Sequence, residues 1–573
     1  MIWKYRKYTT EEEAWPLARE LTRPVKYCQF LLARGFHSAS EIRSFTDAPL
    51  KNLPRPERMP GMKEAVELFL KAKERGDTIA IYGDYDADGL TATAVLSRFF
   101  SSLGYKVISR IPNRLSDGYG LNPQAVQDLY DQGAGLLVTV DCGVSDFDAI
   151  LLANDLNLPV VITDHHVIPP VLPPAQAIIN PHLGKGFEVS PLAGVGVAFM
   201  LAWGVHRAFE RKNGKLHITP PLVEYLSLVA LGTIADLAPL TGINRTLVRN
   251  GLKYLSRSEW PSLRALKSAA RLDLEANVTV RDVGFRLAPK LNAAGRLGSA
   301  TPALELLTTD DESKALTLAD KLEQLNRARY EGQMKLLELA LEKLKETDSS
   351  SDLTVVLSGV DWPKGLLGLV ASKVAELTHK PTVLFSLEDD KASGSGRTAP
   401  GFDLYTALSD TRDLCISLGG HSEAAGLKLM SENLEEFKEV FEESAARQPL
   451  PGIEDEVLID FEASLEDLTV LAKYFQELEP FGQGYPSPHA VVRNVKVTDA
   501  APTRTNGDKH MVLRIVDGTN LISLVGYNMA RLLPTVEPLM DIVLTFDSSM
   551  NNFKLPNWRV VDFKSAGSYI SPW

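Results

Sequence analysis

The chain has 573 residues, of which 45% are hydrophobic and 23% are charged, the proportions of an ordinary folded protein and not of a disordered one. Its longest apolar run, roughly residues 191–205, is too short and too rich in glycine to cross a bilayer, and no apolar stretch follows the basic N-terminus as a secretory signal would require. The formal net charge of −12 resides in residues 431–480, with 15 acidic and 3 basic side chains, so it is consistent with a solvated acidic face and does not exclude a basic groove elsewhere.

Three cysteines, Cys28, Cys142 and Cys415, lie far apart in the chain. Their odd number and wide spacing exclude a disulfide framework and a zinc site of the CxxC type. We therefore expect a reducing, cytoplasmic location.

In chain order, residues 1–60 predict short helices and turns, and a regular alternation begins at Gly61. Short β-branched segments alternate there with helical patterns near 61–70, 90–103 and 146–155. The predicted strands are residues 79–82, 106–111, 135–140, 159–163 and 177–180. This alternation is typical of a parallel sheet with crossover helices.

Residues from about 299 to 346 are almost unbroken helix formers, which predicts a long helix between two globular parts. A second α/β unit opens with the segments 353–357 and 381–385 and holds two glycine-rich segments, 393–398 and 418–422. Four strand-like segments between about 489 and 563 predict a small antiparallel barrel. The expected units are residues 1–60, 61–255, 256–346, 347–455 and 456–573.

Three carboxylates lie within five residues, at Asp84, Asp86 and Asp88. They repel one another, so they either raise one another's pKa values or require a hard cation such as Mg²⁺, Mn²⁺ or Ca²⁺. The start of an EF-hand loop is excluded, because Val95 occupies the position that requires glutamate and the preceding flank is strand-like. A solvated turn without a metal remains the alternative for this motif alone.

Acids and histidines also follow three further apolar segments. The segment 136–140 ends in Asp141, 159–163 ends in Asp164-His165-His166, and 226–231 runs into Gly232-Thr-Ile-Ala-Asp236. Because ligands bind at the carboxyl ends of strands in open α/β sheets, we expect these segments to share one crevice. Mixed carboxylate and imidazole ligands favour Mn²⁺ or Mg²⁺, and their number predicts two ions, the usual apparatus for attack of water on phosphorus.

These segments resemble the motifs of the DHH phosphoesterase superfamily, namely residues 84–89, 140–143, 163–166 and 232–236. Four more motifs narrow the resemblance to exonucleases specific for single-stranded DNA: residues 286–296, 393–397, 418–421 and 480–484. The resemblance covers residues from about 20 to 565. It implies a parallel-sheet DHH domain joined by a long helix to a second, DHH-associated α/β domain, with a C-terminal OB-fold.

The resemblance also implies the role of each matching residue. The metal ligands would be Asp86, Asp88, Asp141, His165 and Asp236, with Asp141 bridging the ions and Asp84 in the same cluster. Among the remaining catalytic residues, His166 would face the scissile phosphate, Asp164 would orient a neighbouring histidine, and His421 would approach from the second domain unless it is a plain turn residue. Many members carry histidine where this chain has Tyr82, so the first ion is expected to have one ligand fewer, or a water.

For the substrate, Arg114, Ser395 and Arg397 resemble the family's pocket for a terminal 5′ phosphate, for which arginine is the natural donor. Tyr119 is expected to stack on a base, unless it is a core residue. Asn292 and Arg296 are expected in a glycine-containing loop along the path of the strand. The implied partner is single-stranded DNA, with a single-strand-binding protein and a helicase as protein partners and no membrane.

The implied activity is that of a 5′-to-3′ exonuclease that uses two Mn²⁺ or Mg²⁺ ions to release 5′ mononucleotides in DNA repair and recombination. Two alternatives remain open. One is a phosphodiesterase of the same superfamily that acts on small oligonucleotides, cyclic dinucleotides or pyrophosphate. The other is a non-catalytic scaffold, which would be expected to lose metal ligands.

Overall fold

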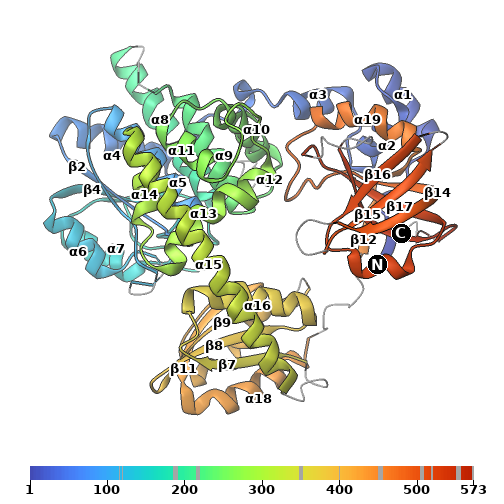
Figure 1. Cartoon of the computed structure of the whole chain (residues 1–573). Coiled ribbons are helices and arrows are strands. Elements are labelled where there is room, and N and C mark those ends of the chain that lie inside the picture. Colours follow the sequence, from blue (N-terminus) through green and yellow to red (C-terminus); the bar gives the residue numbers. More distant parts are fainter. Residues whose placement is uncertain are drawn as a thin grey trace.

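The computed structural model describes the whole chain except residues 115–116, 119, 185–191, 215–217, 219, 347–352, 399–400, 449–455, 504–508, 518–519, 550–556, 569 and 571–573. Figure 1 shows three bodies: an α/β body in blue and green, a second α/β body in yellow and orange, and a barrel in red. Helix α15 (Glu312–Glu346) runs from the first body to the second. The predicted fold class is confirmed. The connecting helix is confirmed over Glu312–Glu346, but the predicted span of about 299–346 is too long, because Thr301–Thr308 forms a separate helix and the chain leaves the helical conformation at residues 309–311.

The first body is built on a parallel five-stranded sheet. Its strands are β2 (Thr78–Gly83), β3 (Lys106–Arg110), β4 (Ala134–Val140), β5 (Val160–Thr163) and β6 (Ala177–Ile179), in the order β3-β2-β4-β5-β6. Ile79 and Ile81 face one apolar cluster, and Ala80 and Tyr82 face another, so both faces of β2 are buried. Burial on both faces explains why these strands are continuous apolar runs.

Helices cover both faces of this sheet: α4 (Met62–Arg75), α5 (Ala87–Ser102) and α8 (Gly194–Asn213) on one face, and α6 (Pro123–Asp131) and α7 (Phe147–Asp155) on the other. Six more helices pack on other helices of the body: α9 (Leu226–Ala235), α10 (Gly242–Ser256), α11 (Pro261–Ala269), α12 (Val280–Asp282), α13 (Ala288–Leu297) and α14 (Thr301–Thr308). One prediction is wrong: the apolar segment before Asp236 is not a strand but helix α9. It packs between α5 and α10 and is buried on every side, so it lacks the periodicity that would distinguish a helix from a buried strand.

The second body has a mixed sheet in the order β10-β11-β9-β8-β7. Its elements are β7 (Val355–Val360), α16 (Lys364–Thr378), β8 (Thr382–Glu388), β9 (Lys391–Arg397), α17 (Leu404–Ser409), β10 (Cys415–His421), β11 (Ala424–Met430) and α18 (Leu434–Ala445). Both glycine-rich motifs therefore lie on strands, and the loop expected at His421 is the end of β10. The glycine in β9 has a packing reason, because a Cβ on Gly394 would lie 2.5 Å from a ring carbon of Phe385.

The third body is a closed barrel. Strands β14 (His489–Pro502), β15 (Met511–Asp517), β16 (Asn520–Gly526), β17 (Leu539–Phe546) and β18 (Trp558–Ser565) form it, and the pairing of β14 with β17 closes it. Three elements precede the barrel: β12 (Glu456–Ile459), β13 (Phe461–Glu462) and α19 (Leu465–Glu477). The exposed acidic side chains of residues 431–480 include those on α18 and α19.

The N-terminal segment belongs to the barrel body. Strand β1 (Ile2–Tyr5) pairs in parallel with β12, and helices α1 (Glu11–Leu21), α2 (Val25–Ala33) and α3 (Ala39–Asp47) follow it. Phe30 of α2 packs against Phe475 of α19 in the same apolar cluster as Trp558. Among the described residues, no helix combines the length and apolar character needed to cross a lipid bilayer.

Candidate metal centre and anion pocket

The carboxylates and histidines of the predicted crevice meet at one edge of the first sheet. Asp84 follows β2, Asp141 follows β4, His165 follows β5, and Asp236 ends α9. Three sets of side chains have metal-binding atoms within 4.8 Å of one another: Asp84, Asp86 and Asp141; Asp88, His165 and Asp236; and Asp141, His165 and His166. Since Asp141 and His165 each belong to two sets, the sets form adjoining sites and not separate ones.

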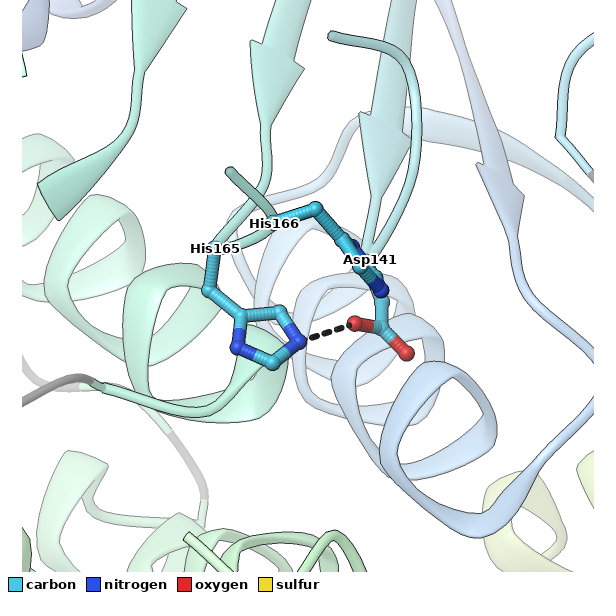
Figure 2. Close-up of side chains that lie close together, drawn as sticks. All are labelled: Asp141, His165 and His166. Atoms are coloured by element: carbon cyan, nitrogen blue, oxygen red, sulfur yellow. Dashed lines mark ion pairs between the residues drawn. The ribbon is translucent and has the colours of Figure 1, made fainter. Parts of the chain in front are cut away.

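His165 lies between the two carboxylate groups. Its Nε2 atom is 3.0 Å from Oδ1 of Asp141 and 3.9 Å from Oδ2 of Asp88. Figure 2 shows the His165 ring directed at the Asp141 carboxylate, with His166 beside it. Two ions held in this arrangement would share Asp141, as the resemblance implies.

The backbone at Asp141 has an uncommon conformation. Its φ is +61°, in the left-handed region that non-glycine residues rarely adopt, and its N–H donates to the carbonyl of Thr163 at 2.9 Å. Such a conformation persists only where the surroundings hold it, and it occurs preferentially at functional sites. Here it places a carboxylate between the two groups of ligands.

Two helix N-termini point their N–H groups at the acids. Asp86 begins α5, and its Oδ1 accepts hydrogen bonds from the N–H groups of Asp88 and Gly89. Asp88 in turn accepts from Gly194 at 2.6 Å and Val195 at 2.9 Å, the first residues of α8. Helix N-termini stabilise negative charge, which allows the chain to concentrate acids here.

Glycines let the helices approach these acids closely. A Cβ on Gly194 would lie 2.6 Å from Oδ1 of Asp141, and one on Gly232 would lie 2.8 Å from Oδ1 of Asp88. Sequence reasoning missed Gly194. The available signal was a glycine at the start of a long apolar run, which was interpreted only as evidence against a membrane span.

The protonation behaviour of the acids indicates that a cation belongs among them. Burial, together with repulsion between neighbouring carboxylates, raises the pKa values of Asp84, Asp141 and Asp236, and it raises the pKa of Asp88 to about 7. Oδ1 of Asp84 is buried and has no hydrogen-bond partner in the described part of the chain. Carboxylate oxygens with one imidazole form a donor set that fits Mn²⁺ or Mg²⁺.

Asp164 and His166 form a hydrogen-bonded pair beside these sites. Asp164 is buried, and Nδ1 of His166 lies 2.8 Å from its Oδ1, while the N–H groups of Val144 and His165 also donate to its carboxylate. Burial alone would raise the pKa of Asp164 and lower that of His166. The hydrogen bond and charge attraction within the pair outweigh burial, lowering the pKa of Asp164 and raising that of His166.

Tyr82 lies away from the metal-binding groups. Its ring is buried in the apolar cluster on one face of the sheet, and its hydroxyl donates to the carbonyl of Gly120 at 3.0 Å. Tyr82, which stands where the resemblance would place a histidine, is therefore part of the core.

Four arginines from distant parts of the chain gather beside the acids. Burial and the positive charges of Arg114, Arg329 and Arg397 lower the pKa of Arg296 to about 10. Arg114 lies 5.1 Å from the ring of Tyr85, and Arg397 donates to Ser395 at 3.2 Å. Among the described residues none of the four forms an ion pair with a carboxylate, so the cluster is suited to bind an anion.

Arg329 was not predicted, because it lies within the regular helical pattern of α15 and no nearby residue in the sequence distinguishes it.

The loop predicted for Asn292 and Arg296 is wrong, since both lie on helix α13. Oδ1 of Asn292 accepts the N–H of Ala87 at 2.7 Å, and Gly295 allows α13 to pack against the backbone of Tyr85. The glycine therefore serves close packing and not a turn.

The structure places two other predicted residues as follows. His421 is exposed at the end of β10, and its Nδ1 accepts the N–H of Glu423 at 3.3 Å; none of the sets of metal-binding groups found in the described part of the chain includes it. Tyr119 lies outside the described residues.

A cavity of about 1200 Å³ lies between the first body and the barrel. Its lining includes Leu237, which follows Asp236 in the chain, and Tyr527 in the barrel. The side chain of Phe285 at its wall is 79% exposed. Basic residues also line it: Arg249, Lys253, Arg257, Arg281 and Arg559.

Adjoining sites for two ions beside an anion pocket place the chain in the class of metal-dependent phosphoesterases. Family models match it in three places: the DHH family N-terminal domain at residues 78–233, the DHHA1 domain at 352–447 and the RecJ OB domain at 459–556. The chain is 34% identical to the single-stranded-DNA-specific exonuclease RecJ of Bacillus subtilis over 555 residues, which cover 95% of this chain and 68% of the relative. The chain belongs to the RecJ family.

Solved structures agree with this assignment. The crystal structure of RecJ in complex with Mn²⁺ from Thermus thermophilus has a TM-score of 0.83 and 29% identity, covering 100% of this chain and 80% of the other. The corresponding complex with Mg²⁺ has a TM-score of 0.78 and 29% identity, covering 100% and 79%. The predicted family is thereby confirmed, and the two related structures hold the ions, Mn²⁺ and Mg²⁺, that the donor set of this chain fits.

Proposed function

We propose that the chain is an exonuclease for single-stranded DNA that hydrolyses phosphodiester bonds from the 5′ end and releases 5′ mononucleotides with two Mn²⁺ or Mg²⁺ ions. The observation that carries this proposal is the arginine cluster beside the paired ion sites. Arg114 and Arg397, which lie near Arg296 as Asp86 does, would hold a terminal phosphate beside the acids. The family to which the chain belongs supports the same substrate.

The arrangement of residues around the ion sites supports digestion from the 5′ end of the strand. The arginine cluster includes Arg397 of the second body and lies near Asp86, whereas the large cavity is lined by Leu237, the residue after Asp236, and by residues of the barrel. A strand whose 5′ phosphate occupies the arginine cluster would pass the ions and continue into the cavity. The opposite polarity would leave the arginine cluster without its dianion.

The cavity has the chemistry that a single strand requires. Arg281 and Arg559 lie 5.1 and 5.8 Å from the ring of Tyr527, and Phe285 exposes its ring to the same space. Unpaired bases stack on such rings, at about 1–3 kcal/mol per base. Both arginines also pair with Asp547, at 2.8 and 3.4 Å, so we assign the phosphates to other basic side chains that line the cavity, such as Lys253 and Arg257. Paired bases offer no free faces to these side chains, which supports the preference for single strands.

In the proposed mechanism the ions, when bound, supply positive charge to the phosphate and lower the pKa of water. The carboxylates described above, Asp141 among them, would hold these ions. Asp164 keeps the His166 ring oriented and favours its protonated form, and the His166 side chain is 46% exposed. We assign His166 as a donor to an oxygen of the scissile phosphate, and His421 as a group that the second body brings to the substrate.

The test is digestion of a labelled single strand that carries either a 5′ phosphate or a 5′ hydroxyl, beside the same sequence as a duplex. We expect mononucleotides from the 5′-phosphorylated single strand only with Mn²⁺ or Mg²⁺. For Asp141→Asn we expect a loss of about 10²- to 10³-fold, the usual cost of removing one group that stabilises charge in the transition state. Asp155→Asn, which changes an exposed acid of the same body, serves as the control. Release from the 3′ end, or an active Asp141→Asn variant, would refute the proposal.

The alternative within the superfamily is a phosphodiesterase for dinucleotides. Turnover of a long single strand is compared with that of a linear and a cyclic dinucleotide, and we expect the long strand to have the higher kcat/KM because only it reaches the barrel.

The resemblance further implies a single-strand-binding protein and a helicase as partners. Co-sedimentation of this chain with each purified protein is the test.

A further inference from the structure

Asp236 stands on an unusual turn at the end of α9. The next residue, Leu237, has φ +57°, although glycine is the usual residue at such a helix end. The N–H of Ala238 closes the turn by donating to the carbonyl of Thr233 at 3.2 Å. Helix α9 thus holds the turn from one side, and its other side must be held elsewhere.

The other side is covered by residues 478–485, which we call the connector because they lead from α19 to the barrel. The N–H of Leu240 donates to the carbonyl of Gln483 at 2.8 Å. A Cβ on Gly482 would lie 2.7 Å from Cδ1 of Leu240, and one on Gly484 would lie 3.0 Å from Cβ of Pro239. The connector is therefore in such close contact with the turn that neither glycine can accept a methyl group without displacement.

A buried arginine fixes the connector to α10. Arg245 is 2% exposed, and its guanidinium donates to the carbonyls of Pro480 at 2.9 Å and Leu478 at 2.5 Å. It also donates to the carbonyl of Phe45 at 3.0 Å and lies 3.5 Å from that ring. Figure 1 shows that the barrel and the N-terminal helices approach the first body on the side of α10 and α12.

We propose that the connector is a positioning element for Asp236, so that the ion held by Asp88, His165 and Asp236 depends on how the barrel is seated. The proposal rests on the proposed function, because it takes these residues as ion ligands. Gly482, Gly484 and Arg245 are the positioning residues. The motif at residues 480–484 thereby acquires a role at the metal centre, although none of its residues is a ligand.

The first test compares Gly484→Ala with Gly567→Ala. The two glycines have similar backbone strain, with φ +72° and +79°, but a Cβ on Gly567 would meet nothing within 4 Å. Binding of Mn²⁺ is measured by titration calorimetry without DNA, beside a thermal unfolding curve. We expect Gly484→Ala to lower the affinity for one of the two Mn²⁺ ions about 10-fold and to leave the affinity for the other unchanged. Gly567→Ala should bind both ions with the affinities of the parent chain.

The second test separates positioning from general destabilisation. In the Asp236→Asn background, where the ligand is already impaired, Gly484→Ala should change Mn²⁺ affinity less than about twofold. If the affinity falls about 10-fold again, or if Gly484→Ala alone binds both ions normally, the proposal is overturned. Since calorimetry reports ion binding without substrate, failure of the proposed nuclease activity would be seen separately.

If Gly484→Ala does not fold, Gly482→Ala provides the same test with a built-in rescue. Its clash is with Cδ1 of Leu240, and Leu240→Val removes that atom. We expect Gly482→Ala to lower the affinity for one of the two Mn²⁺ ions. The double variant Gly482→Ala, Leu240→Val should bind that ion with an affinity within about twofold of that of the parent chain. Absence of that rescue would contradict the contact on which the proposal depends.

Discussion

A methyl group added at Gly194 would test whether the ion sites depend on the close approach of α8 to Asp141. In Gly194→Ala the new Cβ would lie 2.6 Å from Oδ1, 2.7 Å from Cβ and 2.8 Å from Cγ of Asp141. Carbon atoms in favourable contact are about 3.5–4.0 Å apart. Either the Asp141 carboxylate moves by about 1 Å, or the start of α8 withdraws and breaks its hydrogen bonds to Asp88.

The magnitude follows from that displacement. A misplacement of about 1 Å in a catalytic arrangement costs about 100-fold in rate, which corresponds to about 2.7 kcal/mol of activation free energy. The helix itself should not suffer, because Gly194 does not have a positive φ and alanine is favoured over glycine in helices by about 1 kcal/mol. We therefore expect an enzyme that is folded but about 100-fold slower.

The assay is the initial rate of nucleotide release from a 5′-phosphorylated single strand at saturating Mn²⁺. The control is Gly196→Ala, two residues further along α8, where the nearest atom is a methyl carbon of Leu192 at 3.2 Å. That side chain can move aside, so the control should keep its rate within about twofold. A Gly194→Ala variant that also stays within about twofold would refute the reasoning.

Three further predictions concern ions, substrate and pH. Mn²⁺ at about 100 times its Kd should stabilise the chain by about 2.7 kcal/mol and raise the melting temperature of the first body by roughly 5–10 °C, and Asp84→Asn should lose at least half of that shift in calorimetry. Arg397→Gln should lower kcat/KM about 10- to 100-fold on a 5′-phosphorylated strand and leave a 5′-hydroxyl strand unchanged; equal losses on both would contradict the phosphate pocket. Burial raises the pKa of Asp146 to about 6, so its favourable contribution to folding is complete below the unfolded value near 3.8 and is lost as the pH rises through 6. Asp146→Asn should therefore raise the free energy of unfolding in urea by up to about 3 kcal/mol at pH 8 and by less at pH 5. An equal gain at the two pH values would show that the stabilisation does not come from removing a buried charge.

Local patterns along the chain predicted much of the metal centre. A buried strand is a short apolar run, and its carboxyl end is where the chain leaves the sheet, so Asp84, Asp141 and His165 could be placed at one edge from the sequence alone. The long helix α15 was predictable for a similar reason, because helix formers continue without a turn signal over its 35 residues. Asp236 was placed near the same crevice, although it ends a helix and not a strand.

Tertiary contacts decided the rest. Arg114, Arg296, Arg329 and Arg397 come together only after two α/β bodies and the helix between them have packed, and no local pattern marks Arg329 as part of an anion pocket. The spacing between α8 and the acids likewise depends on packing, which is why Gly194 was missed.

The barrel body likewise combines features that the sequence predicted with contacts that it did not predict. Four of the five barrel strands were predicted from their own sequence pattern. The fifth strand, β18, and the pairing of β1 with β12, which joins opposite ends of the chain, were not predicted. Alternation reports which face of an element is buried and says nothing about which distant segment covers it. Sequence alone therefore determined the chemical groups at the ends of the strands, and folding determined the distances between them, because those distances depend on contacts made by residues far apart in the chain.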